Sequence, residues 1–308
     1  MKSFLNISEV SSKDLRSIID DAALRKINRK NLNKSSPDSD KPFEGKCMIM
    51  IFEKPSTRTR ISFDIATKQL GGSSIILNPD GIHYGKGNET IKDTAKVLSQ
   101  YADIIMIRTN LHENLEEFKQ NSLIPVINGL SEQSHPCQIM SDILTFEETK
   151  GSITGKTISW IGDGNNNMCN SLIEAAGKFK FKIKVGCPTK YKPNKKIISW
   201  AKKNKVILEI FQDPNKAVLN SDCIMTDKWI SMNDKVNKKI KKKALKKYQV
   251  NKKLMKMSKP DSVFMHCLPV SRGDEVTNEV IDGKQSIVWL QALNRVHVQK
   301  SIINWCLS

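Results

Sequence analysis

Short apolar runs rich in β-branched residues alternate with longer helical patterns along almost the whole chain. The apolar runs are 48–52, 74–77, 104–107, 125–128, 156–161, 181–186, 206–210, 223–226 and 263–266. Runs of this kind are typical of strands that are covered on both faces, and strands that alternate with helices form parallel sheets. We therefore expect an α/β fold in which central parallel sheets are flanked by helices.

The alternation forms two successive series. A helical pattern over 136–150 separates them, and 308 residues is about twice the usual size of one domain. We predict a first domain over 1–150 and a second over 151–283. A C-terminal helix over 284–308 is long enough to return to the first domain and complete it, so this helix and 136–150 would be the two interdomain helices.

The composition narrows the possible classes of protein. A hydrophobic content of 39% and a charged content of 27% suit a globular protein with a buried core. No apolar run has the length of a membrane span, and the first residues lack the apolar stretch of a signal peptide. The seven cysteines include no C-x-x-C pair, so neither a zinc knuckle nor a disulfide framework is indicated. We expect a cytoplasmic protein with reduced thiols and no membrane partner.

The net charge of +18 raises the alternative of a protein that binds nucleic acid or another anionic surface. However, the positive charge is mostly lysine, and its densest stretch, 235–256, is typical of one or two solvated helices. Only eight residues are arginines, and aromatic residues make up 6% of the chain, which leaves few side chains for base stacking. We therefore expect no nucleic-acid partner.

One turn gives the clearest binding signal. It is the segment Ser56-Thr57-Arg58-Thr59-Arg60. It lies between an apolar run and a helical pattern over 61–70, so it forms the entry of a helix, where unpaired N–H groups and the helix dipole favour an anion. Hydroxyls and guanidiniums add donors that suit phosphate oxygens. A phosphate-sized dianion is the preferred interpretation, and a capped helix with solvated arginines is the alternative.

Two glycine-containing segments fail as nucleotide motifs. In 161–167, Asn167 stands where a dinucleotide fingerprint needs its third glycine, and the next strand ends in Cys187-Pro188 instead of an acidic residue. In 81–87, Gly87 stands where a P-loop needs Ser or Thr. Neither a nicotinamide cofactor nor ATP is expected. The asparagines at 165–167 instead offer neutral donors and acceptors to a small zwitterion.

Two histidine-containing segments follow apolar runs. They are His135-Pro136-Cys137-Gln138 and His266-Cys267-Leu268-Pro269. The carboxyl ends of parallel strands lie at one edge of a sheet, so His135 would share that edge with the Ser56 turn. Cys267 has no adjacent base in the sequence, which disfavours a covalent thiol mechanism and leaves a buried small hydrophobe as the alternative.

Four motifs, taken in order, closely resemble those of the ornithine carbamoyltransferase family. They are Phe52 to Arg60, His135 to Gln138, Asp227-x-Trp229-x-Ser231-Met232, and His266 to Pro269. The resemblance extends from about residue 4 to residue 305. The first two motifs mark carbamoyltransferases in general, whereas the last two are specific, because aspartate carbamoyltransferases differ there. The resemblance implies a carbamoyl-phosphate domain followed by an ornithine domain.

The resemblance also implies residues that bind carbamoyl phosphate. Its phosphate would be held by Ser56, Thr57, Arg58 and Thr59. Its carbonyl oxygen and amide would be held by Arg108, His135 and Gln138. The reacting groups would be flanked by Cys267, the Leu268 carbonyl and Arg295. His83 stands near a position that is often Gln in the family, in a loop that reaches a neighbouring subunit's carbamoyl-phosphate site.

For the second substrate, the resemblance implies that L-ornithine is held by Asn167, Asp227, Ser231 and the Met232 backbone. Arg58, Arg108 and His135 would stabilise the charge that develops on the carbonyl oxygen. Asp227 and Cys267 would help to supply the δ-amine in its neutral form. The implied products are L-citrulline and phosphate, with no metal or organic cofactor, in a homotrimer that serves arginine biosynthesis.

The chain departs from the family pattern at four places. Asn233 replaces a usual glycine, Leu293 replaces a usual glutamate, the loop 82–89 is one residue longer, and the stretch 235–256 is far more basic than its usual counterpart. Two alternatives also stay open: an enzyme that uses putrescine or an N-acylated ornithine, and a catabolic enzyme that shares every motif.

Overall fold

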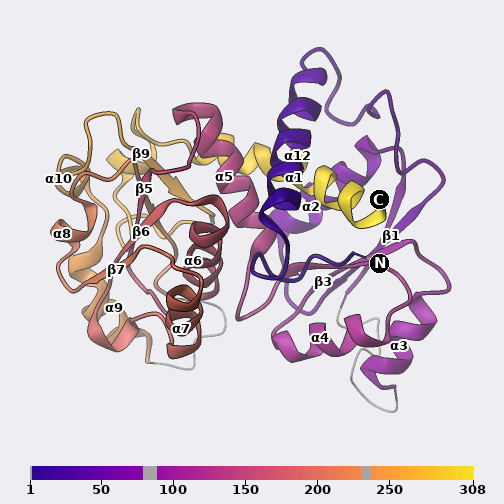
Figure 1. Cartoon of the computed structure of the whole chain (residues 1–308), viewed down its shortest axis with the longest axis horizontal. Coiled ribbons are helices and arrows are strands. Elements are labelled where there is room, and N and C mark those ends of the chain that lie inside the picture. The colour runs from indigo at the N-terminus through magenta and orange to yellow at the C-terminus, as the bar shows by residue number, and fades with distance from the viewer. Residues whose placement is uncertain (1, 79–88, 231–236) are drawn as a thin grey trace. The chain divides into compact units, whose positions relative to one another are not determined.

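The chain folds into two compact units, each built around one parallel sheet (Figure 1). The computed structural model describes residues 2–78, 89–230 and 237–308. One unit comprises the residues up to Leu144 together with Asn294–Ser308, and the other comprises Thr145–Leu293. Helices α5 (Pro136–Lys150) and α12 (Val288–Leu307) each continue across this division. The predicted α/β class with two parallel sheets is confirmed.

The sheet of the first unit has the strand order β2-β1-β3-β4. Its strands are β1 (Cys47–Phe52), β2 (Ser73–Leu77), β3 (Ile104–Arg108) and β4 (Val126–Leu130). The chain adds β2 on one side of β1 and β3 on the other, so the direction of winding reverses between β1 and β3. Open α/β sheets bind ligands beyond the carboxyl ends of the strands at such a reversal.

In the described part of the first unit, four helices belong entirely to it. They are α1 (Ser12–Asn28), α2 (Thr57–Gln69), α3 (Ile91–Leu98) and α4 (His112–Asn121). Ser11 caps α1 by accepting a hydrogen bond from the Asp14 N–H. The helix ends at Asn28, and the Arg29 side chain donates to the Asn33 carbonyl in the turn that follows.

One strand of this sheet corrects the sequence interpretation. The run at 74–77 was expected to be covered on both faces, but β2 is the edge strand, and Ile75 is 50% exposed. A β-branched run therefore indicates a strand here without indicating its place in the sheet.

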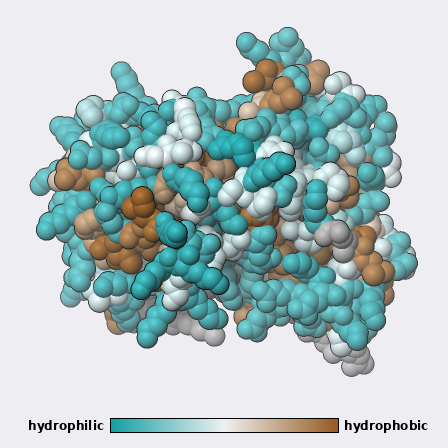
Figure 2. All heavy atoms as spheres, viewed as in Figure 1, coloured by the Kyte–Doolittle hydropathy of each residue, from teal (hydrophilic) through white to brown (hydrophobic). Residues whose placement is uncertain are grey.

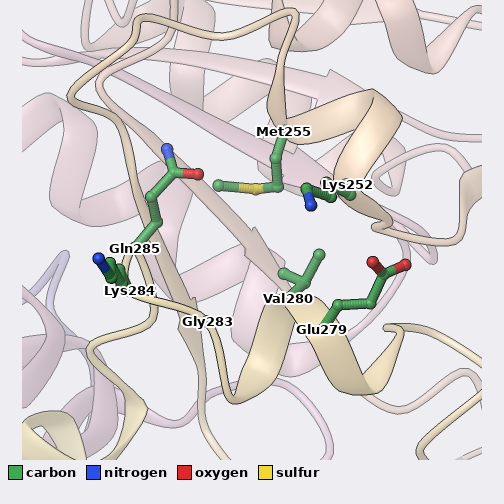
Figure 3. A pocket seen from close by; sticks show the side chains of 7 residues that line it. All are labelled: Lys252, Met255, Glu279, Val280, Gly283, Lys284 and Gln285. Atoms are coloured by element: carbon green, nitrogen blue, oxygen red, sulfur yellow. The ribbon is translucent and has the colours of Figure 1, made fainter.

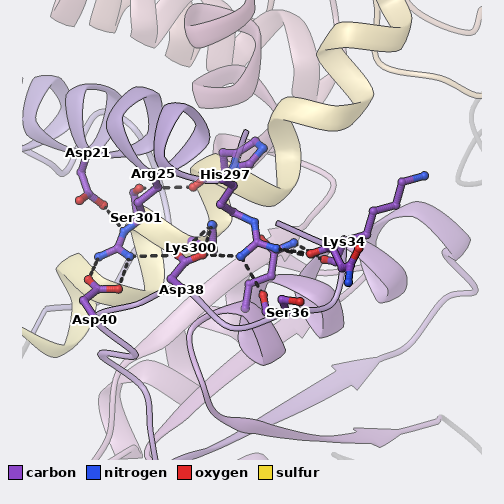
Figure 4. A network of polar contacts seen from close by, with 12 residues as sticks. Asp21, Arg25, Lys34, Ser36, Asp38, Asp40, His297, Lys300 and Ser301 are labelled. Carbon is purple, nitrogen blue, oxygen red and sulfur yellow. Dashed lines mark hydrogen bonds and ion pairs between the residues drawn. The ribbon is translucent and has the colours of Figure 1, made fainter. Parts of the chain in front are cut away.

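A buried ionic network joins α1, α12 and the polar loop that follows α1 (Figure 4). The Asp38 carboxylate accepts hydrogen bonds from Arg29 at 2.6 Å and from Arg25 at 3.2 Å on one side. Lys300 of α12 donates to the same carboxylate at 2.9 Å. Lys26 adds a second link to α12 through Asn294, at 2.8 Å. These contacts fix the first-unit part of α12 against α1.

The sheet of the second unit has the order β7-β6-β5-β8-β9. Its strands are β5 (Thr157–Ile161), β6 (Lys182–Gly186), β7 (Leu208–Phe211), β8 (Cys223–Thr226) and β9 (Val263–His266). Its helices are α6 (Asn167–Phe179), α7 (Lys195–Lys203), α8 (Pro214–Val218), α9 (Lys238–Leu245), α10 (Lys252–Met255) and α11 (Asn278–Ile281). The winding reverses between β5 and β8, which places a second candidate binding edge there.

The lysine-rich stretch is only partly the solvated surface that the sequence predicted. It contains α9 and α10, whose Leu245 and Leu254 pack into the apolar core of this unit. Lys241 is also buried, because it meets a buried carboxylate. Hydrophilic residues predominate on the face in Figure 2, with hydrophobic residues in separate patches. No helix in the described ranges is long and apolar enough to span a membrane.

Candidate active site

The entry of α2 has an unusual charge for a helix N-terminus. Ser56 caps the helix by accepting the Thr59 N–H at 3.4 Å. As predicted, the segment that starts at Ser56 forms the entry of a helix: α2 begins at Thr57, so Arg58 and Arg60 lie in its first turn, which contains no acidic residue. Cations are unfavourable at this end of a helix dipole. The turn therefore suits a bound anion, although two cations in the first turn are unfavourable for the helix itself.

The two arginines of this turn have different surroundings. The Arg60 guanidinium contacts the Asn78 side chain and lies 5.7 Å from the centre of the Phe52 ring. Arg58 is close enough to His135 to influence its protonation. Arg58 therefore lies near the other predicted carbamoyl-phosphate residues, while Arg60 is engaged by neighbouring parts of the fold.

Thr59 lies between two further guanidiniums. Its hydroxyl oxygen accepts a hydrogen bond from Arg108, at the end of β3, at 3.3 Å. It accepts another from Arg295, on α12, at 2.9 Å. All three side chains are buried. Three predicted residues from distant parts of the chain thus converge beside the reversal between β1 and β3.

Arg295 also connects this group to α5. Its second terminal nitrogen donates to Gln138 Oε1 at 2.6 Å. The Gln138 amide in turn donates to Asp142 Oδ1 at 2.8 Å, one helical turn further along. The amide is therefore held in one orientation, with its oxygen toward Arg295. The sequence analysis missed Asp142, although its spacing of four residues from Gln138 in a helical pattern signals such a pair.

His135 is buried beside the same arginines. Burial, followed by the charges of Arg295, Arg108 and Arg58, holds the pKa of His135 well below its ordinary value. The imidazole is therefore neutral near pH 7. A neutral imidazole supplies one N–H donor and one acceptor, which suits a carbonyl or amide ligand better than a second charge would.

Lys54 adds to the positive potential and was not assigned a role from the sequence. Burial and then the charge of Arg108 lower its pKa, while Glu53 and Glu132 oppose that shift. The Glu53 carboxylate accepts the Asn110 N–H at 2.7 Å, which ties the segment after β1 to the segment after β3. Mutual repulsion between Lys54 and Arg108 would be relieved by a bound anion.

In the second unit, the asparagine turn follows β5 at the second reversal. Asn166 caps α6, because its side-chain oxygen accepts the Cys169 N–H at 2.8 Å. Its side chain is therefore committed to the helix, and the three asparagines are not equivalent donors, as the sequence analysis had treated them. Asn167, the predicted ornithine residue, is half-buried in the first turn of α6.

Asp227 and Cys267 are brought together by neighbouring strands. They follow β8 and β9, which pair in register with Thr226 opposite His266. The Cys267 thiol donates to Asp227 Oδ1 at 3.1 Å, and the same oxygen accepts the Lys228 N–H at 2.7 Å. The sequence offered no base beside Cys267, but the adjacent strand supplies a carboxylate. This pair can accept a proton from an amine.

A buried histidine supports the loop that carries Cys267. His266 Nδ1 accepts the Leu268 N–H at 2.9 Å, and its Nε2 lies 3.4 Å from the Glu275 carboxylate. The Leu268 backbone has a φ of 54°, which is uncommon for a residue with a side chain. Strained backbone that is held by such contacts is frequent at binding sites, and Leu268 is one of the predicted site residues.

Two further points concern metals and cavities. Among the described residues, potential ligand atoms of Asp227, His266 and Cys267 lie within 4.8 Å of one another. However, His266 Nδ1 already accepts the Leu268 N–H, and the Cys267 thiol already donates to Asp227, so contacts within the protein account for this grouping. A pocket beside Met255 and Val280, drawn in Figure 3, includes no predicted site residue.

Three predicted site residues lie outside the described part of the chain. They are His83, Ser231 and Met232. Their assignments stay predictions, as does the effect of Asn233.

Comparison with known proteins decides the family. The carbamoyl-P binding domain of aspartate/ornithine carbamoyltransferase matches residues 2–148, and the Asp/Orn binding domain of that family matches 154–306. The ornithine carbamoyltransferase of Rhodopseudomonas palustris is 48% identical over 304 residues, which are 99% of this chain and 96% of that protein. The chain belongs to the ornithine carbamoyltransferase family. The relative from Mesorhizobium japonicum is likewise 48% identical, over 100% of this chain and 99% of its own length.

Solved structures of the ornithine carbamoyltransferase family share the fold. The enzyme from Pyrococcus furiosus has a TM-score of 0.92 at 42% identity, covering 98% of this chain and 96% of that one. The anabolic enzyme from Campylobacter jejuni has a TM-score of 0.90 at 33% identity, covering 99% of each chain. The resemblance inferred from the four motifs is thereby confirmed, together with the carbamoyltransferase class of enzyme.

Proposed function

We propose that this protein transfers the carbamoyl group of carbamoyl phosphate to the δ-amine of L-ornithine, giving L-citrulline and phosphate. The observation that carries the proposal is the convergence of Thr59, Arg108 and Arg295 beside neutral His135. This buried, positive group suits a small dianion that also has a carbonyl. The names of the full-length relatives support ornithine as the acceptor.

The first unit would bind carbamoyl phosphate. The entry of α2 offers N–H groups and hydroxyls, and Ser56, Thr57, Arg58 and Thr59 would hold the phosphate. Arg108, His135 and Gln138 would bind the carbamoyl oxygen and amide, with Arg295 beside them. Because these donors are held by the fold before reaction, they can stabilise charge on the carbonyl oxygen and on the leaving phosphate.

The second unit would bind and activate ornithine. A free δ-amine has a pKa of about 10.4, so it is mostly protonated at neutral pH and must lose a proton before it can attack. The Asp227 carboxylate, with the Cys267 thiol at 3.1 Å, would accept that proton. The new C–N bond then forms, the δ-nitrogen gives up its second proton to the departing phosphate, and the bond from the carbamoyl carbon to the phosphate oxygen breaks, so that its electron pair leaves with phosphate. Asn167, Ser231 and Met232 would hold the α-amino and α-carboxylate groups, and the Leu268 carbonyl would orient the δ-amine.

We further propose domain roles, assembly and pathway. Residues 1–150 with 284–308 would form the carbamoyl-phosphate domain, and 151–283 the ornithine domain. A cytoplasmic homotrimer is proposed from the family resemblance, with His83 near a neighbouring subunit's site. The anabolic relative from Campylobacter jejuni supports a role in arginine biosynthesis.

A steady-state assay with carbamoyl phosphate and a panel of amines tests the activity. We expect turnover with ornithine and little with putrescine or N-acetylornithine. Arg58→Ala should lower kcat/KM for carbamoyl phosphate by about 10²-fold or more, as loss of one preorganised donor does. Arg60→Ala is the matched control, because Arg60 is engaged by Asn78 and Phe52, and its effect should stay within about tenfold.

No detectable transfer to ornithine by the folded wild-type protein would refute the proposed activity. Equal losses in the two arginine variants would refute the special role of Arg58.

A further inference from the structure

The turn that carries Asn167 is built around one buried carboxylate. Asp163 Oδ1 accepts the Asn165 N–H at 2.8 Å, and the Asp163 carbonyl accepts the indole N–H of Trp160 at 2.8 Å. The next residue, Gly164, has no room for a side chain, since a Cβ there would lie 2.9 Å from the Tyr191 carbonyl oxygen. The turn is therefore closely packed, and its geometry depends on Asp163.

A lysine from α9 occupies the other oxygen of this carboxylate. Lys241 Nζ lies 2.6 Å from Asp163 Oδ2, and the two side chains are only 5% and 7% exposed. The same ammonium lies 5.6 Å from the centre of the Tyr191 ring. The Gly164 N–H donates to the Tyr191 carbonyl at 2.9 Å. Lys241 thus contacts both the carboxylate that shapes the turn and the residue that packs against it.

The position of α9 in the chain makes this contact important. The segment that begins at Asp227 after β8 leads through 231–236 into α9. Asn237 caps α9 by accepting the Lys239 N–H at 3.0 Å, and Leu245 packs into the apolar core. The ion pair therefore joins the helix that follows the predicted ornithine segment to the turn that presents Asn167.

A gain in folding stability alone does not readily explain a buried ion pair. Removing two charges from water is costly, and well-packed apolar residues of similar volume are often as stable as a buried ion pair. Such a pair does fix one geometry, because both charges lose a partner when either moves. Because the pair lies beside the asparagine turn, the geometry that it fixes is that of the turn that presents Asn167.

We propose that Lys241 is a positioning residue for the amino-acid substrate: its buried ion pair with Asp163 holds the turn that presents Asn167. This inference rests on the proposed function, because it assigns the turn to ornithine. It gives one lysine of the basic stretch a role that its neighbours lack.

The test compares Lys241→Met and Lys241→Arg with the wild type in the steady-state assay. Lys241→Met should raise KM for ornithine about tenfold or more while KM for carbamoyl phosphate changes by less than about twofold. Lys241→Arg keeps the charge and should recover most of the loss. Lys242→Met is the matched control, since Lys242 is exposed and pairs with Asp274, and both KM values should stay at wild-type levels.

A second readout does not depend on catalysis. Hydrogen exchange at the Asn165 and Cys169 amides, which are bonded to Asp163 and Asn166, should quicken in Lys241→Met and not in Lys242→Met. If the wild type fails to use ornithine, the proposed function fails, while exchange still tests the positioning. Unchanged exchange, or a folded Lys241→Met protein whose two KM values change equally, would overturn the inference.

Discussion

Thr59 accepts two guanidinium donors on one hydroxyl oxygen. A neutral acceptor holds Arg108 and Arg295 in converging orientations without cancelling their charge. A carboxylate at that position would neutralise the site and compete with an anionic ligand. The residue therefore organises the positive group while leaving its potential available, which is what preorganised electrostatic stabilisation requires.

The suppressed protonation of His135 leads to a prediction about acid stability. The unfolded chain takes up a proton near pH 6.5, whereas the folded chain does so only at much lower pH. Stability therefore falls as the pH drops below about 6.5, by up to about 1.4 kcal/mol per pH unit. His135→Asn removes this pH-dependent contribution. The amount by which the unfolding free energy of the variant falls below that of the wild type should therefore shrink between pH 7 and pH 5.

Urea unfolding of both proteins at several pH values measures that difference. His297 titrates in the same direction in both proteins and cancels in the comparison. A deficit that stays constant across this pH range would contradict the low pKa of His135.

The sequence predicted elements better than the contacts between them. Helix α5 and strands β8 and β9 have the expected bounds, because flanking turn residues punctuate strong apolar runs. The contact between Thr59 and Arg295 joins residues 236 positions apart, and only the family resemblance placed both in one site. The burial of Lys241 could not be predicted for a related reason. A run of lysines is typical of a solvated surface, and the sequence does not show which of them has a buried partner.

At the level of elements, Asp38 is expected to hold α12 in place. Burial raises the pKa of Asp38, but the hydrogen bonds and charges of Arg29 and Lys300 outweigh burial and lower it below its ordinary value. Asp38→Asn would leave buried cations without a counter-charge, and we expect a loss of about 3–5 kcal/mol of unfolding free energy at pH 7.

Chemical denaturation measures this loss, and Asp40→Asn is the control. Asp40 lies in the same loop as Asp38 and pairs with Arg25, but its side chain is 53% exposed. Asp40→Asn should therefore lose less than about 1 kcal/mol of unfolding free energy. The unfolding free energy of the wild type should exceed that of Asp38→Asn above about pH 4. This difference should be lost as the pH falls through the lowered pKa of Asp38. Equal losses of unfolding free energy in Asp38→Asn and Asp40→Asn would contradict the expectation that the buried carboxylate contributes more than the exposed one.

Across the whole molecule, the charge of +18 belongs mainly to lysines that are dispersed along the chain. Dispersed lysines keep a protein soluble and repel like molecules, but they do not read bases. The candidate site uses arginines instead, which are few and concentrated in the first unit, where their planar donors match oxyanions.

This distribution predicts weak, purely electrostatic contact with DNA. Fluorescence anisotropy with a duplex should detect binding at about 20 mM salt and none at physiological salt. Carbamoyl transfer at physiological salt should be unaffected by added duplex. Binding that persists there and disappears when exposed lysines of 235–256 are neutralised would restore the nucleic-acid alternative.

The first unit is discontinuous in the chain, and this affects how it is made. Arg295 and Lys300 reach Thr59 and Asp38 from a segment that follows the whole second unit in the chain. A nascent chain that has completed the first sheet still lacks the Arg295 guanidinium that contacts Thr59 beside Arg108. Translation must pass through the entire second unit before this contact can form, so the proposed binding of carbamoyl phosphate requires that the second unit has already been synthesised.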